Sequence, residues 1–180
     1  MGEYQHVFHT FLPVYDEESE ILILGSFPSV KSREQSFYYG HPQNRFWKVL
    51  EILVHECKQS QTTTMSIEEK RQMLLVHHIA LWDVIEECDI AGSSDSSIKN
   101  VKINAIAEIV RKSKIHTIYT NGATATKLYQ RYAEEKVGMK CIQLPSTSPA
   151  NAAYSLERLC EAWSCVGSVR RISKLPKYVN

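Results

Sequence analysis

Short apolar runs alternate with longer amphipathic runs along most of this chain. The short runs are rich in β-branched residues and predict strands at residues 20–25, 79–84, 115–121 and 140–145. Between them, apolar residues recur at the 3.6-residue spacing of a helix in the stretches 46–54, 103–110, 125–132 and 156–163. A further helix is predicted over 66–78, because Ser66 and Glu69 have the spacing of a capping box.

The alternation of strands and helices predicts the fold class. Right-handed crossovers between such elements produce a parallel sheet that is covered on both faces. We therefore expect a three-layer α/β/α sandwich with a central four-stranded parallel sheet. Two polar segments interrupt the pattern. Residues 59–64 have the composition of a linker between helices, and residues 91–97 form a small-residue loop after the second predicted strand, where ligand-binding loops are found.

Length and composition limit the class of protein. With 180 residues, 43% of them hydrophobic, the chain is predicted to form one domain over 1–180, with its core at 8–165 and a tail at 167–180. No run approaches the roughly eighteen apolar residues of a membrane span, and the N-terminus lacks the apolar region of a signal peptide. The five cysteines include no C-x-x-C pair, which argues against a disulfide framework or a zinc ribbon. These features predict a soluble cytoplasmic protein without membrane contact.

Charge is balanced over the chain but not along it. The net charge is +1, whereas Arg170, Arg171, Lys174 and Lys177 crowd the tail without an acid among them. A solvated, frayed terminus is the favoured interpretation, and contact with DNA is the alternative.

Polar residues gather where the first predicted strand ends. The strand runs into Gly25-Ser26-Phe27-Pro28, and His41-Pro42-Gln43-Asn44 follows after a short polar loop. Pro42 suits the first position of a helix, which would place Asn44 in the first turn and off the apolar face. The amide then either projects into a ligand crevice or satisfies a free backbone N–H at the helix start. The residues alone leave these two interpretations level.

A second polar cluster follows the fourth predicted strand. Ser146, Thr147 and Ser148 lie between Pro145 and Pro149, so a stiff loop presents three hydroxyls that suit phosphate oxygens. An ordinary connection to the next helix, with Ser155 as its cap, is the alternative. No set of metal ligands, P-loop, G-x-G-x-x-G or G-x-S-x-G motif occurs in the sequence.

The segments 25–28, 39–47 and 144–151 together resemble the uracil-DNA glycosylase superfamily. The resemblance is closest to its hypoxanthine-DNA glycosylase branch, whose members are also called DNA-deoxyinosine glycosylases. It implies one α/β/α domain that binds DNA across the carboxyl ends of its strands and flips a damaged base into a pocket. It also implies a monomer that needs no metal or other cofactor, and whose partner is DNA containing a deaminated base.

The resemblance implies roles for individual residues. Many superfamily members carry Asp or Asn between the glycine and proline of the first motif, whereas this chain has Ser26 and Phe27 there, so the catalytic role passes to Asn44. The implied base pocket comprises Gly25, Ser26, Phe27, Tyr39, His41 and Asn121. The implied DNA contacts are Pro28, Lys31, Ser146, Thr147, Ser148, Pro149 and Asn151. Asp83 and Asp95, at a strand end and in the following loop, are further candidates.

The expected activity is hydrolysis of the glycosidic bond of deoxyinosine, without strand cleavage, in a prokaryotic cytoplasm and its nucleoid. A uracil or G/U mismatch glycosylase of the same superfamily is the alternative, and a catalytically inactive nucleic-acid-binding domain is the second. One amide can pair with the carbonyl and N–H of hypoxanthine, but a flipped amide matches adenine equally well. We therefore expect a backbone group or His41 to fix the orientation of the Asn44 amide.

Overall fold

A four-stranded parallel sheet forms the centre of the computed structural model, which describes residues 4–55, 65–91 and 97–167. The strand order is β3-β2-β6-β7. The strands are β2 (Ile21–Gly25), β3 (Ile79–Asp83), β6 (Thr117–Asn121) and β7 (Cys141–Leu144). All four lie within the predicted segments, and the parallel pairing is confirmed.

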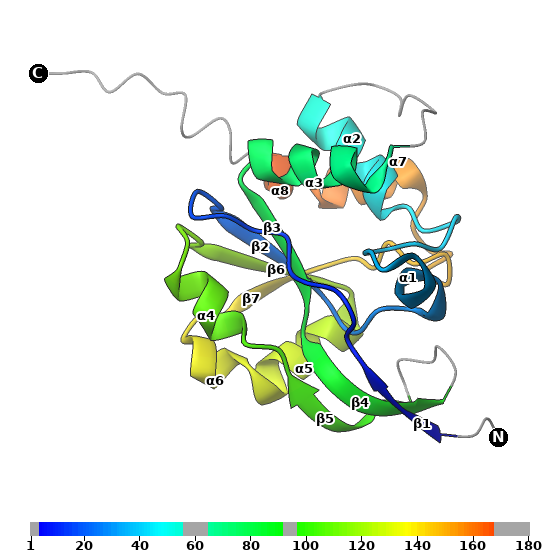
Figure 1. The fold of residues 1–180 in the computed structure, drawn as a ribbon. Helices are drawn as coiled ribbons and strands as arrows, with labels where there is room; N and C mark the ends of the chain where they lie inside the picture. Colours follow the sequence, from blue (N-terminus) through cyan, green and yellow to red (C-terminus); the bar gives the residue numbers. More distant parts are fainter. Residues whose placement is uncertain (1–3, 56–64, 92–96, 168–180) are drawn as a thin grey trace, which may run out of the picture.

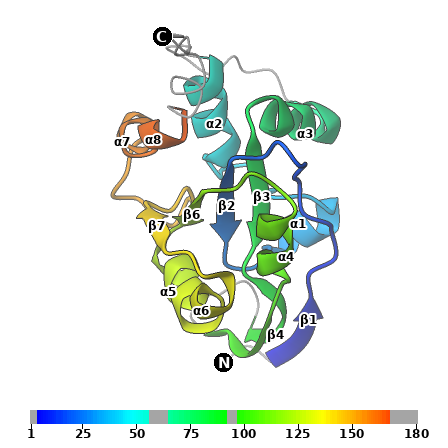
Figure 2. The same cartoon turned by 90° about the vertical axis from the view of Figure 1, so that its left-hand side faces the viewer.

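Helices cover both faces of this sheet (Figures 1 and 2). One layer contains α2 (Phe46–His55), α3 (Ile67–Val76), α7 (Leu156–Ala162) and α8 (Ser164–Gly167), and the other contains α4 (Ile106–Arg111), α5 (Ala123–Tyr132) and α6 (Glu134–Val137). The central strand β2 serves both layers. Ile21 and Ile23 join the core under α2, while Leu22 and Leu24 join the core under α5. The predicted three-layer sandwich is therefore confirmed.

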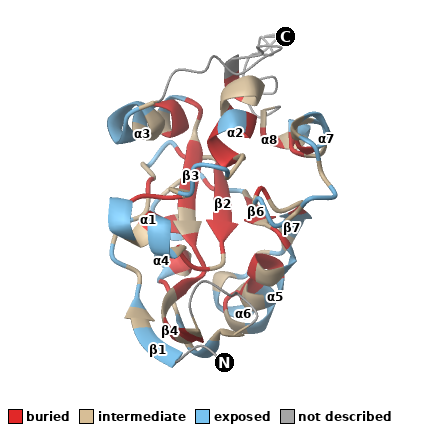
Figure 3. Ribbon diagram, turned by 90° about the vertical axis from the view of Figure 1, so that its right-hand side faces the viewer, coloured by how far each residue is buried: buried red, intermediate tan, exposed pale blue. Residues whose placement is uncertain are grey.

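Burial is deepest in β2, the strand that leads into the first polar cluster (Figure 3). All five residues of β2 are buried, and its four apolar side chains have no exposed surface. Each such side chain contributes about 1.5–3 kcal/mol through burial. The end of β2 is thus a rigid base for the residues that follow Gly25.

A second sheet was not predicted. It is antiparallel, with the order β1-β4-β5, and consists of β1 (Tyr4–Phe8), β4 (Ile85–Ala91) and β5 (Lys99–Ile103). Only Val84 separates β3 from β4, and the Asn104 amide holds this bend by donating to the Asp83 and Ile85 carbonyls at 2.9 and 3.0 Å. Ile103, which was expected to begin a helix, instead ends β5, and that helix begins at Ile106.

Three local features sharpen or correct the prediction. A short helix, α1 (Val30–Gln35), follows the first motif and was not predicted. The helix expected at Pro42 begins only at Phe46, because residues 41–44 form a turn in which the Asn44 N–H donates to the His41 carbonyl at 2.8 Å. The capping box of Ser66 and Glu69 is confirmed at the start of α3.

Several predicted features fall outside the described residues: the polar linker 59–64, most of the loop 91–97 including Asp95, and the basic tail. Among the helices that the structure describes, none is long and apolar enough to cross a membrane.

Candidate active site

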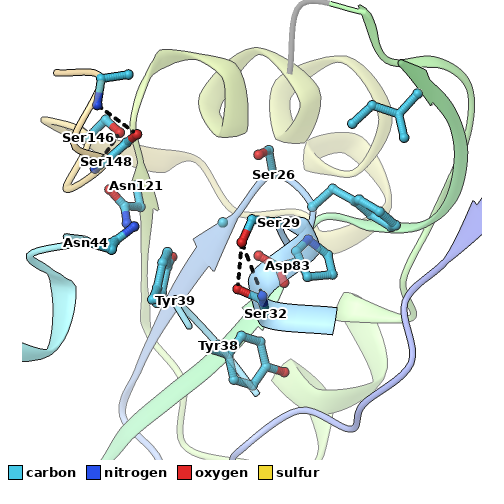
Figure 4. Close-up of a pocket in the computed structure, with 15 residues that line it drawn as sticks. Ser26, Ser29, Ser32, Tyr38, Tyr39, Asn44, Asp83, Asn121, Ser146 and Ser148 are labelled. Carbon is cyan, nitrogen blue, oxygen red and sulfur yellow. Dashed lines mark hydrogen bonds between the residues drawn. The ribbon is translucent and has the colours of Figure 1, made fainter. Parts of the chain in front are cut away.

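A cavity of about 380 Å³ opens at the carboxyl ends of β2, β3 and β6 (Figure 4). Its lining brings together the two polar clusters of the sequence, the end of β3 and the start of α1. The lining residues are Gly25, Ser26, Phe27, Pro28, Ser29, Ser32, Tyr38, Tyr39, Asn44, Asp83, Ile90, Asn121, Ser146, Ser148 and Ala150. The volume lies in the range of small-ligand pockets, and the position is where open α/β sheets bind ligands.

Asn44 and Asn121 lie side by side at one side of this pocket, and Thr147 connects them (Figure 4). Backbone N–H groups can only donate, so they identify the oxygen of each amide. The Phe46 N–H lies 3.0 Å from Asn44 Oδ1, and the Thr147 N–H lies 2.9 Å from Asn121 Oδ1. Asn121 Nδ2 therefore donates to Thr147 Oγ1, and that hydroxyl donates onward to Asn44 Oδ1, both at 2.9 Å.

This chain of hydrogen bonds fixes the orientation of the Asn44 amide. Its oxygen accepts two hydrogen bonds, which occupies both lone pairs. Its Nδ2 group has no acceptor among the residues that the structure describes, and Asn44 lines the pocket. Asn44 thus does both things that the sequence left open: it satisfies a free N–H at the start of α2 and presents a donor to the cavity.

His41 does not fix the amide as expected. It is exposed, does not line the pocket, and its Nδ1 accepts a hydrogen bond from the Gln43 N–H at 3.2 Å. The expected backbone partner is the Phe46 N–H, and the side-chain partner is Thr147. The sequence did not identify Thr147 in this role because the hydrogen bond links residues 103 positions apart.

The loop after β7 differs from the expected row of DNA-binding hydroxyls. Thr147 has no exposed surface, so it cannot contact DNA in this structure. Asn151 Nδ2 donates to the Ser146 carbonyl at 2.8 Å, and the hydroxyls of Ser146 and Ser148 accept N–H groups of the loop itself. Ser146 and Ser148 also line the pocket, whereas Pro149 is exposed. Stabilising the loop is therefore the role that the structure assigns to most of these groups.

The remaining predicted contact, Lys31, lies on α1. Its side chain is 55% exposed and forms an ion pair with Glu34 at 2.8 Å. Pro28, immediately before that helix, is buried and lines the pocket.

Arg45 is a structural residue that the sequence reasoning missed. Its guanidinium donates to the Ser148 and Asn151 carbonyls at 2.6 and 3.0 Å, and also to the Tyr154 carbonyl. Its backbone N–H donates to the Thr147 carbonyl at 3.1 Å. Arg45 therefore fastens the loop after β7 to the start of α2. Its place beside Asn44 was the only signal in the sequence.

Gly25 and Asp83 are partners across β2 and β3 and meet at the bottom of the pocket. Asp83 is 4% exposed. A Cβ atom on Gly25 would lie 2.2 Å from Asp83 Oδ1, so only glycine leaves room for this carboxylate. The lack of a side chain at position 25 thus has a specific structural reason.

Aromatic side chains form the apolar part of the lining. Phe27 is 7% exposed and lies under the Arg33 guanidinium, whose central carbon is 5.5 Å from the ring centroid. Tyr39 stacks on Phe46 with 3.9 Å between ring centroids. Burial, followed by the nearby Asp83 carboxylate, raises the pKa of Tyr38 well above its ordinary value, so its hydroxyl stays neutral and donates to the Leu12 carbonyl at 3.0 Å. Within the described part of the chain, no group of three His, Cys, Asp or Glu residues could hold a metal ion.

The fold and the pocket define the class of protein. The family model of the Uracil DNA glycosylase superfamily matches residues 12–166, a span that contains every residue lining the pocket. The chain belongs to this superfamily, and the protein is a DNA glycosylase.

Individual relatives agree with this assignment. A protein of Methanosarcina acetivorans named hypoxanthine DNA glycosylase is 37% identical over 159 residues, which cover 87% of this chain and 95% of that protein. A protein of the same name from Methanosarcina barkeri is 40% identical over 94 residues, covering 52% of this chain and 57% of the relative. A solution structure from Methanosarcina acetivorans, described as a uracil DNA glycosylase, superposes with a TM-score of 0.72 at 35% identity, covering 87% of this chain and 94% of that one.

Proposed function

We propose that this protein hydrolyses the N-glycosidic bond of deoxyinosine in DNA, releasing hypoxanthine and leaving an abasic site. The observation that carries the proposal is the Asn44 amide, whose donor end faces the pocket because its oxygen is held by Phe46 and Thr147. The names of the two Methanosarcina relatives support the choice of hypoxanthine.

The pocket suits a base that has left the duplex. A glycosidic bond inside stacked DNA is out of reach of protein groups, and a deaminated, mispaired base costs less to extrude than a paired one. The buried Phe27 ring supplies a flat apolar surface beside the polar groups. Proposed contacts with the flanking DNA come from two segments beside the pocket. One contains Pro28 and Lys31, and the other is the loop after β7, through Ser146, Ser148 and Pro149 but not the buried Thr147.

Asn44 has a direct part in the proposed reaction. Breaking the bond between C1′ and N9 leaves positive charge on the sugar and negative charge on the departing base. A donor aimed at the base carbonyl becomes more favourable as that charge develops, so it stabilises the transition state more than the ground state. Water then adds to C1′, and the base takes up a proton.

The fixed amide also favours hypoxanthine over adenine. Adenine carries an amino group where hypoxanthine carries the carbonyl, so Asn44 Nδ2 would face a second donor. Rotating the amide would turn Nδ2 toward the Phe46 N–H and the Thr147 hydroxyl. Each hydrogen bond lost in this way costs about 1–3 kcal/mol.

Exchange of Asn44 for alanine tests the proposal. In single-turnover excision on a deoxyinosine duplex, we expect Asn44→Ala to be slower than the unmodified protein by about 100- to 1000-fold, the usual cost of removing one such donor. The exposed neighbour Gln43, changed to alanine, is the control and should leave the rate unchanged. Equal rates for Asn44→Ala and the unmodified protein would remove Asn44 from the mechanism.

Uracil is the second candidate substrate. It has the same carbonyl beside an N–H, and the similar solution structure is described as a uracil DNA glycosylase. Excision assays on duplexes that differ only in deoxyinosine, deoxyuridine or deoxyxanthosine separate the two, and faster release of uracil would favour this second function.

The proposed reaction is hydrolytic and forms no covalent bond to the protein. None of the described residues that line the pocket is a lysine. We expect borohydride to trap no complex with DNA, and a trapped complex would show Schiff-base chemistry instead.

A further inference from the structure

The Asn44 amide satisfies only the carbonyl on the hydrogen-bonding edge of hypoxanthine. Beside its carbonyl the base carries a ring N–H at N1, which is a donor and needs an acceptor when it is buried. Asn44 cannot supply that acceptor, because both lone pairs of its oxygen are taken by Phe46 and Thr147. A second group must therefore face the base.

Asp83 has the position and the chemistry of that acceptor. It ends β3, on one side of β2, whereas Asn44 is held by Thr147 and Asn121 on the β6 side. Figure 4 shows the two residues on opposite sides of the end of β2. The Asp83 Oδ1 atom occupies the space that a side chain on Gly25 would take, at the bottom of the cavity.

His9 holds this carboxylate in place. Its Nε2 atom lies 2.9 Å from Asp83 Oδ2, and the two side chains are 2% and 6% exposed. A carboxylate can only accept, so the histidine donates to Oδ2, and among the described residues no hydrogen bond is found at Oδ1. The imidazole is packed against Phe11, 4.4 Å between ring centroids, which restricts its movement.

We propose that Asp83, positioned by His9, accepts the ring N–H of the flipped base while Asn44 donates from the other side. The proposal rests on the proposed function and deepens it, because a fixed donor and a fixed acceptor together select bases with a carbonyl beside an N–H. Hypoxanthine, uracil and xanthine have that edge. Adenine presents a lone pair at N1, which would face the Asp83 oxygen without a proton between them.

The size of the expected selectivity follows from burial. A site that leaves its own buried polar groups unpaired with the wrong ligand can reject that ligand by about 10⁴-fold. Asp83 at 4% exposure has no bulk water to replace the missing donor. Rejection of undamaged adenine thus arises from two residues whose orientations are set outside the pocket.

Asp83→Asn is the decisive variant, because it keeps the shape and reverses the polarity. His9 would donate to the new amide oxygen, so the amide NH₂ would take the place of Oδ1 and face the base. It would then oppose the N1–H of hypoxanthine and pair with N1 of adenine. We expect hypoxanthine excision to fall by about 100-fold or more.

Binding of uncleaved DNA provides the second measurement. Duplexes with 2′-fluoro-deoxyinosine or 2′-fluoro-deoxyadenosine at one position are compared in excess undamaged competitor, since the fluorine prevents hydrolysis. We expect the unmodified protein to prefer the inosine duplex by about 100-fold, less than the limit of about 10⁴-fold because contacts with the flanking DNA are the same in both duplexes. We expect Asp83→Asn to reduce that preference below about 10-fold. A folded Asp83→Asn protein with the unmodified preference would overturn the proposal.

Asp89→Asn is the matched control. Asp89 also accepts from a histidine, at 2.7 Å from His6 Nδ1, but it lies on β4 and does not line the pocket. Its substitution should leave both excision and preference unchanged. Failure of the proposed function can be distinguished from failure of this proposal. If the unmodified protein releases no hypoxanthine, its binding to the uncleaved duplexes still measures its base preference.

A pair of substitutions at His9 tests its positioning role and covers the case in which Asp83→Asn does not fold. His9→Gln keeps a donor near the place of Nε2, and His9→Phe keeps the ring shape without one. We expect His9→Gln to retain the inosine preference and His9→Phe to lose most of it. If folded His9→Phe keeps the full preference for the inosine duplex, His9 has no positioning role. If Asp83→Asn does not fold, the same result overturns the whole proposal.

Discussion

Two histidine–aspartate pairs lie close together in this chain, and their surroundings differ sharply. His9 and Asp83 meet at 2.9 Å with side chains 2% and 6% exposed, at the bottom of the pocket. His6 and Asp89 meet at 2.7 Å across β1 and β4 with side chains 50% and 28% exposed. The surface pair is the shorter, yet water can replace either of its partners. Distance alone therefore does not rank the two pairs, and burial does.

The surface pair also has more partners than the buried one. The Asn100 amide and then His6 lower the pKa of Asp89 through their hydrogen bonds, and Lys102 bridges Glu86 and Glu87 nearby. In the pocket, Asp83 accepts from His9 and is 4% exposed. The comparison predicts large effects for substitutions in the pocket and small ones on the outer sheet.

The largest effect on stability is expected from removing one histidine of each pair. His9→Ala leaves the buried Asp83 carboxylate without its donor, which should lower the free energy of unfolding by about 3 kcal/mol or more. His6→Ala should lower the free energy of unfolding much less, because water can replace the exposed imidazole. Urea denaturation of both variants measures the difference, and equal losses would show that burial is not what separates the pairs.

A side chain added at Gly25 is expected to have the next largest effect. Gly25→Ala would place its Cβ 2.2 Å from Asp83 Oδ1, which must then move. Misplacement of a group at an active site by about 1 Å can cost about 100-fold in rate, and we expect a loss of that order in deoxyinosine excision. Gly138→Asn is the control, because no atom lies within 4 Å of its Cβ position and asparagine tolerates its positive φ of 75°. An unchanged rate for Gly25→Ala would contradict the role of Asp83.

Thr147 tests the polar chain on the other side of the pocket. Thr147→Val keeps the shape but removes both the donor to Asn44 and the acceptor for Asn121. We expect excision to slow by about 10-fold, because one hydrogen bond of about 1.4 kcal/mol no longer orients the amide. Thr147→Ser keeps the hydroxyl and should retain most of the activity. Similar rates for the valine and serine variants would mean that the Phe46 N–H alone orients Asn44.

The smallest effect concerns the pH dependence of the surface pair. Because the pKa of Asp89 is lowered in the folded protein, Asp89 stabilises the fold at pH values above its unfolded pKa of 3.8. This stabilisation is lost as the pH falls through the folded pKa. Because the pKa of His6 is raised in the folded protein, His6 stabilises the fold at pH values below its unfolded pKa of 6.5. This stabilisation is lost as the pH rises through the folded pKa. The difference in melting temperature between Asp89→Asn and the unmodified protein should thus be greatest near pH 5. Melting curves at pH 3, 5 and 9 check this, and a difference that does not vary with pH would contradict it.

The parallel sheet was predictable because both of its faces are buried, which leaves continuous apolar runs in the sequence. The outer sheet was not, for two physical reasons. Four of the five side chains of β1 are exposed and carry little apolar pattern, and β4 follows β3 after the single residue Val84. The apolar pattern of β4 therefore merges with that of β3 in the sequence.

The candidate site was predictable in position but not in its internal contacts. The sequence placed Gly25, Asn44 and the loop after β7 at one end of the sheet, and all three contribute to the pocket. It could not give the burial of Thr147 or the contact between His9 and Asp83, since the latter residues are 74 positions apart. Hydrogen bonds between distant segments depend on how the layers pack, which no local pattern records.

The close approach of Gly25 and Asp83 has an evolutionary consequence. Any side chain at position 25 is incompatible with the carboxylate as it lies, whereas a smaller residue at position 83 would remove the conflict. Substitutions at these two positions are therefore not independent, and their order matters. A descendant of this protein can gain a side chain at position 25 without losing activity only after position 83 has changed. Base selectivity would therefore change before the sequence of the first motif does.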